Sequence, residues 1–237
     1  MVQPLEGRDL RIPTGCKSLD DLLGGGIPSG RVTLIYGEAE TGKTSLTIQC
    51  AVNLAKIGYR TIFVDSDGTF SPERLCQIAG GEADEVSARI IVVRPNDFWE
   101  QSNVIDNLDR YVTAKIGLII FDTITSLYRA ELGTSRETFQ LNRELNRQVA
   151  TLSEVTKEYG IATILTSQVR SVIDRDENRV EPVATRVLKF WSDIVISLRK
   201  THSGHVKARL EKTPSGDKIV ECYLAMGPSG IYNMKSE

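Results

Sequence analysis

The chain has 237 residues, of which 41% are hydrophobic and 25% are charged, and its formal net charge is -2. This length and composition suit one α/β domain, so we expect residues 1–237 to form a single domain, with residues 1–13 as a lead segment. The balanced charge excludes a basic field over the whole molecule, and the chain has neither an apolar run of membrane-spanning length nor a signal-peptide pattern at its start. We therefore expect a cytoplasmic protein without a membrane partner.

Short β-branched runs alternate with helical patterns along the first two thirds of the chain. Strands are predicted at 32–36, 61–65, 90–93, 118–122 and 162–166, and helices after Gly42 and at 72–78, 98–115 and 136–159, where Gly160 is a stop signal. Because the strands are almost continuously apolar, this alternation predicts a mostly parallel sheet with helices on both faces. After Pro182, strand-like segments at 193–199, 206–210 and 219–226 predict antiparallel strands added at the C-terminal end.

A phosphate-binding motif lies between the first predicted strand and the helix that follows it. The pattern G-x-x-x-x-G-K-[ST] is formed by Gly37, Glu38, Ala39, Glu40, Thr41, Gly42, Lys43 and Thr44, and Ser45 comes next. Glycine permits the tight loop that turns backbone N–H groups inward, and the helix N-terminus adds partial positive charge where phosphate oxygens would lie. Strand, loop and helix in this order predict a site for ATP.

Three polar side chains are expected to complete the phosphate site. Lys43 is expected to contact the β- and γ-phosphates, while the Thr44 hydroxyl and Asp122, which ends an apolar strand, are expected to hold Mg²⁺. Simpler interpretations are a glycine-containing turn without a ligand, and a strand-end carboxylate at Asp122 that caps a loop. The motif, its context and Asp122 together favour the nucleotide site.

Four further segments of the sequence match one protein family. They are Thr14-Gly15 with 18–20 and 22–27, the segment 65–75, the segment 121–131, and the segment 166–169. On these residues the chain resembles the RecA/RadA recombinase family, and most closely its archaeal RadB branch. The resemblance covers most of the chain from Thr14 onward and implies a RecA-like P-loop NTPase core.

The resemblance implies roles for three polar residues around the nucleotide. Asp67 matches the acidic residue that polarises the attacking water, but typical members carry Glu, which reaches roughly 1 Å further, so slow turnover is expected. Arg74 matches the arginine that stacks on adenine, and Gln168 matches the glutamine that senses the γ-phosphate and moves the loop after it. The simpler interpretations are that Asp67 is a turn carboxylate beside Asp65 and that Arg74 is a solvated charge on a helix. For Gln168 the simpler interpretation is a polar residue at a strand end whose hydrogen bonds are satisfied.

Two arginine-containing segments match the DNA loops of the family, 129–136 and 170–186. Their candidate DNA-binding residues are Arg129, Arg136, Arg170, Arg175 and Arg179. Acidic residues are interspersed among them and aromatic residues are few, so binding to ssDNA is expected to be weak and salt-sensitive, with dsDNA as a second candidate. The alternative is that these segments are solvated surface loops.

The resemblance also implies how the chain assembles. Only a short segment precedes Thr14, so we expect neither a separate N-terminal DNA-binding domain nor the linker that joins neighbouring subunits. A RadA-type recombinase is the expected protein partner, and a homo-oligomer is a second candidate assembly. Lys212 lies where the family reaches a neighbour's nucleotide, and it is interpreted either as a cation for ATP on an adjacent subunit or as a surface hairpin lysine.

These expectations combine into one function with two alternatives. The first is a DNA-repair accessory protein that binds ATP and Mg²⁺, hydrolyses ATP slowly, binds ssDNA modestly and modulates a RadA recombinase. The second is a KaiC-like regulatory ATPase on the same core, and the third is a nucleotide-gated interaction module in which ATP sets the shape without significant hydrolysis. The family matches at 70–74 and at Tyr128-Arg129 favour the first.

Overall fold

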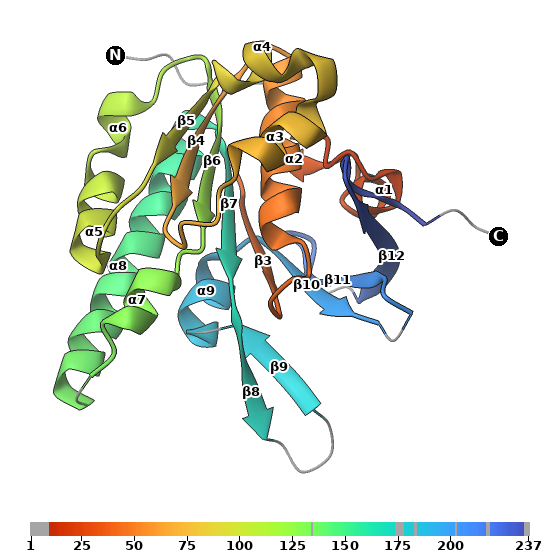
Figure 1. Ribbon diagram of the computed structural model, residues 1–237. Helices are drawn as coiled ribbons and strands as arrows, with labels where there is room; N and C mark the ends of the chain where they lie inside the picture. Colours follow the sequence, from red (N-terminus) through yellow and green to blue (C-terminus); the bar gives the residue numbers. More distant parts are fainter. Residues whose placement is uncertain are drawn as a thin grey trace.

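A computed structural model describes the backbone of residues 10–133, 135–173, 178–182, 184–201, 203–216 and 219–234, and the side chains of these residues except 135–136, 170–173, 178–182 and 185. Within this part of the chain, nine strands form one sheet in the order β13-β12-β11-β10-β3-β7-β6-β4-β5 (Figure 1). These strands are β3 (Val32–Gly37), β4 (Arg60–Asp65), β5 (Ile90–Val93), β6 (Ile116–Asp122), β7 (Ala162–Ser167), β10 (Ile194–Lys200), β11 (Val206–Lys212), β12 (Val220–Gly227) and β13 (Gly230–Asn233). A separate two-stranded pair joins β1 (Arg11–Ile12) to β2 (Ile27–Pro28).

The sheet is parallel from β10 to β5 and antiparallel from β10 to β13. The predicted α/β class, with a mostly parallel sheet and antiparallel strands added at the C-terminal end, is thereby confirmed. Every residue of β3, β6 and β7 is buried, which agrees with the continuous apolar runs in their sequences.

Helices cover both faces of the sheet. They are α1 (Lys17–Leu22), α2 (Lys43–Lys56), α3 (Pro72–Ala79), α4 (Ala83–Ser87), α5 (Phe98–Asp106), α6 (Leu108–Tyr111), α7 (Ser126–Ala130), α8 (Ser135–Tyr159) and α9 (Thr185–Trp191). Figure 1 shows α1, α2 and α3 on one face and α5, α7, α8 and α9 on the other. Two buried apolar clusters result, one on each face of the sheet.

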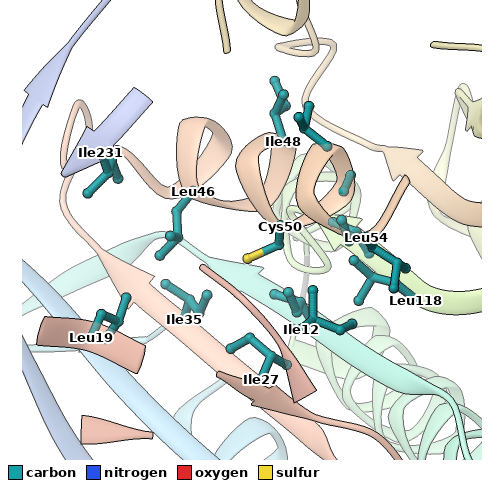
Figure 2. Close-up of a cluster of buried hydrophobic side chains, with 14 of the residues drawn as sticks. Ile12, Leu19, Ile27, Ile35, Leu46, Ile48, Cys50, Leu54, Leu118 and Ile231 are labelled. Carbon is teal, nitrogen blue, oxygen red and sulfur yellow. The ribbon is translucent and has the colours of Figure 1, made fainter. Parts of the chain in front are cut away.

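The first cluster fixes the helix that follows the phosphate loop. Leu46, Cys50 and Leu54 of α2 point toward Ile35 of β3 and Leu118 of β6, as Figure 2 shows. All five side chains are fully buried. Since burying an aliphatic side chain of this size contributes about 1.5–3 kcal/mol, the packing holds the start of α2 firmly against the sheet.

The longest described helix, α8, covers the second face. Leu141, Leu145, Val149 and Leu152 follow a helical spacing and are buried, while the opposite side of the helix is polar. Gly160, with φ 64°, follows its last residue, as predicted. None of the helices within the described ranges combines the length and the apolar composition needed to cross a bilayer.

The predicted single helix at 98–115 is wrong in its extent. The structure has α5, an interruption at Asn107 and then the short helix α6. The Asn107 amide donates hydrogen bonds to the backbone oxygen of Asn103 at 2.8 Å and to its side-chain oxygen at 3.0 Å. Asparagine side chains compete for backbone groups in this way, which disfavours continuation of a helix.

The segment predicted as the second DNA loop contains regular structure. Strands β8 (Val169–Ile173) and β9 (Asn178–Pro182) pair antiparallel, and α9 follows them. Figure 1 shows this hairpin extending away from the main sheet. The β-branched residues Val169, Val172 and Ile173 favour the extended strand. The loop expectation is therefore corrected to a hairpin and a helix within the described residues.

Candidate nucleotide site

The side chains predicted to bind a nucleotide meet at one edge of the sheet. Strands β3, β7, β6 and β4 are parallel neighbours, so their carboxyl ends lie together, and α2 begins at the same edge. A cleft of about 280 Å³ opens there. It is lined by Ala39, Glu40, Gly42, Lys43, Thr44, Ser45, Asp67, Thr69, Thr123 and Gln168. Ligands of open α/β sheets bind at such strand ends.

The loop between β3 and α2 has the backbone geometry of an anion site. Glu40 and Gly42 have φ values of 59° and 85°, in the left-handed region where successive N–H groups can converge on an anion. A Cβ at Gly42 would lie 2.7 Å from the Met226 sulfur, and one at Gly37 would lie 2.3 Å from the Leu198 carbonyl oxygen. Close packing against backbone therefore requires glycine at position 37, and the left-handed backbone conformation favours glycine at position 42.

The Lys43 ammonium lies against its own loop. The residue is 8% exposed, and Nζ donates hydrogen bonds to the carbonyl oxygens of Gly37 at 2.8 Å and Glu38 at 2.7 Å. Burial lowers the pKa of Lys43, and the carboxylates of Asp122 and Asp67 oppose that shift. Ammonium groups bond more strongly to charged phosphate oxygens than to neutral carbonyls, so Lys43 is placed to exchange these partners for phosphate.

Asp122 is a buried carboxylate whose two oxygens differ in their hydrogen bonding. Its Oδ1 accepts a hydrogen bond from the Thr166 hydroxyl, while Oδ2 has no hydrogen-bond partner among the described residues. Burial raises the pKa of Asp122, and the Thr166 and Thr44 hydroxyls oppose the shift, although Thr44 does not reach hydrogen-bond geometry with Oδ2. An orphaned buried carboxylate oxygen is costly, and a hard cation satisfies it. Asp122 and Thr44 therefore fit the donor set that Mg²⁺ takes.

The two carboxylates at the end of β4 have different surroundings. Asp65 is fully buried, accepts two backbone N–H groups of the following turn, and pairs with Arg94 Nε at 2.9 Å. Asp67 lines the cleft, where its Oδ2 lies 3.4 Å from the Thr123 hydroxyl and 3.3 Å from Gln168 Nε2. Asp65 thus shapes the turn, whereas Asp67 faces the cleft, which favours the site interpretation of Asp67 over a turn carboxylate.

Gln168 joins the cleft to the hairpin. It lies between the last residue of β7 and the first residue of β8. Its Nε2 faces Asp67, and its Oε1 accepts a hydrogen bond from the Arg129 guanidinium on α7. Gln168 therefore lines the cleft and has a partner that the sequence did not indicate, while its sensing of the γ-phosphate stays a prediction.

Arg74 lies at the outer end of the phosphate loop. Its Nε donates to the Ser45 hydroxyl at 3.1 Å, and NH1 donates to the Pro228 carbonyl oxygen at 2.8 Å and to Gln77 Oε1 at 3.2 Å. These bonds hold the guanidinium beside the first turn of α2. Its contact with adenine stays a prediction.

The five arginines proposed for DNA differ in what the structure describes. Arg129 is exposed on α7 and bonds to Gln168. The backbones of Arg136, Arg170 and Arg179 belong to α8, β8 and β9, but their side chains lie outside the described part, and Arg175 lies outside the described residues altogether. DNA binding by these residues stays a prediction.

Lys212 has a role within its own chain. Its Nζ donates hydrogen bonds to the carbonyl oxygens of Lys189 at 2.9 Å and Ser192 at 2.6 Å, at the C-terminal end of α9. A cation there satisfies carbonyls that a helix end leaves free. This arrangement favours a structural lysine over a cation for the nucleotide of an adjacent subunit.

Replacing Lys212 by alanine is expected to lower the free energy of unfolding by about 1–2 kcal/mol, because the end of α9 loses a charged donor. Urea unfolding measures this, beside Lys207→Ala, which removes only a half-exposed pair with Glu221. ATP affinity is expected to stay unchanged. A normal unfolding free energy together with lost ATP turnover at high protein concentration would support the inter-subunit role instead.

A larger hollow, of about 570 Å³, lies at the opposite edge of the sheet. It is lined by Arg11, Leu22, Leu23, Gly24, Pro28, Ser29, Arg31, Ile194, Leu210, Thr213, Pro214 and Ser215. None of these described lining residues is acidic, and the phosphate loop does not reach it. The larger hollow therefore lacks the side chains expected of a phosphate site, and these line the smaller cleft.

Sequence reasoning missed several contacts that shape the site. Thr166 fixes Asp122, and Arg129 fixes Gln168. Gln101 is fully buried on α5, where its Oε1 accepts from the Ser66 hydroxyl at 2.7 Å and its Nε2 donates to the Ile124 carbonyl oxygen at 3.2 Å. It thus ties together the chain segments that follow β4 and β6. The available signal was a polar residue in the apolar stripe of a predicted helix.

Comparison with known proteins identifies the family. Residues 7–234 match the Rad51 family. The DNA repair and recombination protein RadB of Methanococcoides burtonii is 35% identical over 218 residues, 92% of this chain and 96% of that protein. RadB of Methanosphaera stadtmanae is 38% identical over 192 residues, which are 80% of this chain and 81% of that protein. A crystal structure of the RadB recombinase matches with a TM-score of 0.82 at 34% identity, and the match covers 94% of this chain and 100% of that chain. The chain therefore belongs to the Rad51 family, in its RadB branch of DNA repair and recombination proteins.

Proposed function

We propose that this chain is an ATP-binding accessory protein of homologous recombination, which hydrolyses ATP slowly, binds ssDNA and modulates a RadA-type recombinase. The observation that carries the proposal is the pair of carboxylates near Lys43. Asp122 has a buried oxygen without a hydrogen-bond partner among the described residues, and Asp67 faces the cleft. A turn without a ligand does not account for either carboxylate, whereas a nucleotide with its metal ion accounts for both.

ATP binding follows from the loop and its lysine. The N–H groups of the loop and of the first turn of α2 hold phosphate oxygens, and Lys43 reaches the β- and γ-phosphates. Thr44 and Asp122 would hold Mg²⁺, which when bound neutralises charge on the phosphate oxygens. Arg74, anchored beside Ser45, covers the adenine end.

Asp67 orients and polarises the water that attacks the γ-phosphate. Its carboxylate is one methylene shorter than that of a glutamate, and its contacts with Thr123 and Gln168 are long, at 3.4 Å and 3.3 Å. A poorly placed carboxylate gives slow turnover because positioning supplies most of the catalysis in phosphoryl transfer.

Replacing Asp67 by glutamate is therefore expected to raise ATP turnover by roughly tenfold, and replacing it by asparagine to remove turnover while ATP still binds. Phosphate release under saturating ATP and Mg²⁺ measures the rates, and calorimetric titration with ATP checks binding. Equal turnover in the wild type and the asparagine variant would reject Asp67 as the water-orienting residue. That result would favour the nucleotide-gated module without hydrolysis.

The DNA and protein partners are supported by the family and by the position of the cleft. The relatives are named DNA repair and recombination proteins, which supports the recombination interpretation over a KaiC-like regulatory one. The hairpin of β8 and β9 begins directly after Gln168, so a segment matching a DNA loop is joined to the cleft by one residue. A change at the γ-phosphate can thus be transmitted to the surface proposed for ssDNA, with dsDNA as a second candidate.

A further inference from the structure

A buried polar cluster lies behind the cleft, where α5 and α8 cover the sheet. Gln101 of α5 and Gln148 of α8 are both fully buried. Gln101 Oε1 accepts a hydrogen bond from the Ser66 hydroxyl at 2.7 Å. Gln101 Nε2 donates to the Ile124 carbonyl oxygen at 3.2 Å and to Gln148 Oε1 at 2.9 Å, and Gln148 Nε2 donates to the Phe98 carbonyl oxygen at 3.4 Å. The oxygen and both N–H bonds of the Gln101 amide therefore have partners, as a buried amide requires.

The two backbone carbonyls fix the direction of every hydrogen bond in this cluster. A carbonyl oxygen only accepts, so the nitrogen of Gln148 must face Phe98. For the same reason the nitrogen of Gln101 must face Ile124. Gln148 then presents its oxygen to the second N–H bond of Gln101, and the Gln101 oxygen is left facing Ser66. The Ser66 hydroxyl must therefore donate, which holds its side chain in one orientation.

Gln101 binds the chain directly beside two residues of the cleft. Ser66 precedes Asp67, and Ile124 follows Thr123. Asp67 and Thr123 both line the cleft, with 3.4 Å between Asp67 Oδ2 and the Thr123 hydroxyl. A single buried amide thus joins the two chain segments that carry these side chains.

Asp67 depends on an anchor of this kind because it lies beyond the end of its strand. β4 ends at Asp65, and 66–68 is a bend outside any helix or strand. The backbone N–H groups of Ser66 and Asp67 both donate to the Asp122 carbonyl oxygen, at 2.9 Å and 3.3 Å. Two bonds to one oxygen leave the bend able to turn about that oxygen, whereas the bond from Ser66 to Gln101 attaches it at a second point, on α5. Attachment at two points gives the bend a defined orientation.

We propose that Gln101 is a positioning residue for ATP hydrolysis, which holds Asp67, through Ser66, at the place where the attacking water is oriented. The inference rests on the proposed function, in which Asp67 polarises that water, and it adds the residue that sets the position of the carboxylate. Gln101 is not among the described residues that line the cleft, so it acts on the rate without contact with ATP. Because a misplacement of about 1 Å can cost on the order of a hundredfold in rate, loss of this bond lowers the rate and spares ATP affinity.

The test measures phosphate release at saturating ATP and Mg²⁺, and ATP affinity by calorimetry, in Ser66→Ala, Gln101→Leu and the control Thr156→Val. Ser66→Ala removes only the contact with Gln101, and it decides the question if Gln101→Leu does not fold. Thr156 is also fully buried, and its hydroxyl bonds to that of Thr163 near the amino end of β7, whereas the cleft lies at the carboxyl end. All three changes remove buried hydrogen bonds and are expected to lower stability to urea.

The two kinds of variant are expected to differ in rate. Ser66→Ala and Gln101→Leu are expected to hydrolyse ATP roughly tenfold to a hundredfold more slowly than wild type, with unchanged ATP affinity. Thr156→Val is expected to keep the wild-type rate. ADP with aluminium fluoride and Mg²⁺, which mimics the transferred phosphoryl group, is expected to bind more weakly to the first two variants by a comparable factor, since a positioning defect acts on the transition state.

Three results would overturn the inference. They are a wild-type rate in folded Ser66→Ala, an equal loss of rate in Thr156→Val, and a loss of ATP affinity that accounts for the slower hydrolysis in Ser66→Ala. If one of these is found while Asp67→Asn removes turnover, only the role of Gln101 is wrong. If Asp67→Asn keeps the wild-type turnover, or wild type does not bind ATP, the proposed function fails and the role of Gln101 fails with it.

Discussion

Replacing Lys43 by alanine is expected to weaken ATP binding by about a hundredfold and to remove measurable turnover. The loss corresponds to roughly 2–3 kcal/mol, the range for hydrogen bonds that involve a charged group. Lys43 is nearly buried at the start of α2, and its ammonium is within reach of both cleft carboxylates, whose charges it balances. Calorimetric titration with ATP and Mg²⁺ measures the affinity.

The matched control is Lys56→Ala, at the other end of the same helix. Lys56 forms a surface pair with Glu82 at 2.9 Å, and such pairs contribute little to stability. Its removal is expected to leave ATP affinity unchanged. Circular dichroism of both variants shows whether α2 remains folded. Equal ATP affinity in Lys43→Ala and wild type would mean that the loop is a structural turn without a nucleotide.

Replacing Asp122 by asparagine is expected to make the protein more stable in the absence of nucleotide while removing the effect of Mg²⁺ on nucleotide binding. Burial raises the pKa of Asp122, so the charged form is disfavoured in the folded protein. The folded chain therefore holds the proton over a pH range in which the unfolded chain has lost it, and the free energy of unfolding falls as pH rises from the ordinary aspartate pKa through the raised one. The neutral amide removes that loss, for a gain of about 1–3 kcal/mol at neutral pH.

Asp65→Asn provides a control of opposite sign. Asp65 is as deeply buried as Asp122, but it pairs with Arg94 and accepts backbone N–H groups, so its replacement is expected to destabilise the fold by about 1–3 kcal/mol. Urea unfolding at several pH values, with and without Mg²⁺ and ATP, compares the two variants. Destabilisation by Asp122→Asn, with Mg²⁺-dependent nucleotide binding retained, would show that Asp122 is a structural carboxylate rather than a metal ligand.

The parallel core was predictable from the sequence because its signals are local. The five predicted strands agree with β3, β4, β5, β6 and β7 to within two residues at each end, since uninterrupted β-branched runs have few alternatives to a buried strand. The phosphate loop and Asp122 were predictable for the same reason: the motif fixes the loop, and a strand that ends in a carboxylate delivers it to the same edge. Asn107 interrupts the predicted helix 98–115 near the middle of that helix, because its side chain competes for backbone hydrogen bonds. Hydrophobic periodicity alone does not predict such an interruption.

The contacts between distant residues were not predictable from local patterns. Arg129 and Gln168 lie 39 positions apart, and Gln101 and Ile124 lie 23 apart. Arg129 and Gln168 meet because they follow β6 and β7, which are neighbours in the sheet, and Gln101 meets Ile124 because α5 packs over the end of β6; local patterns specify neither contact. The hairpin of β8 and β9 was missed because interspersed charges masked a short β-branched pattern. The contacts of Lys212 were not indicated because its acceptors lie at the end of α9, a helix that the sequence did not indicate.

The most direct test is fluorescence anisotropy of a labelled ssDNA, titrated with the protein in the presence of ATP, ADP or no nucleotide at two salt concentrations, beside Lys43→Ala. The expected result is salt-sensitive binding that changes with ATP in the wild type and does not respond to nucleotide in Lys43→Ala, since phosphate contacts are screened by salt and the cleft is joined to the hairpin through Gln168. Absence of ssDNA binding in every nucleotide state would contradict the proposed function and leave a nucleotide-dependent protein that acts on other proteins alone.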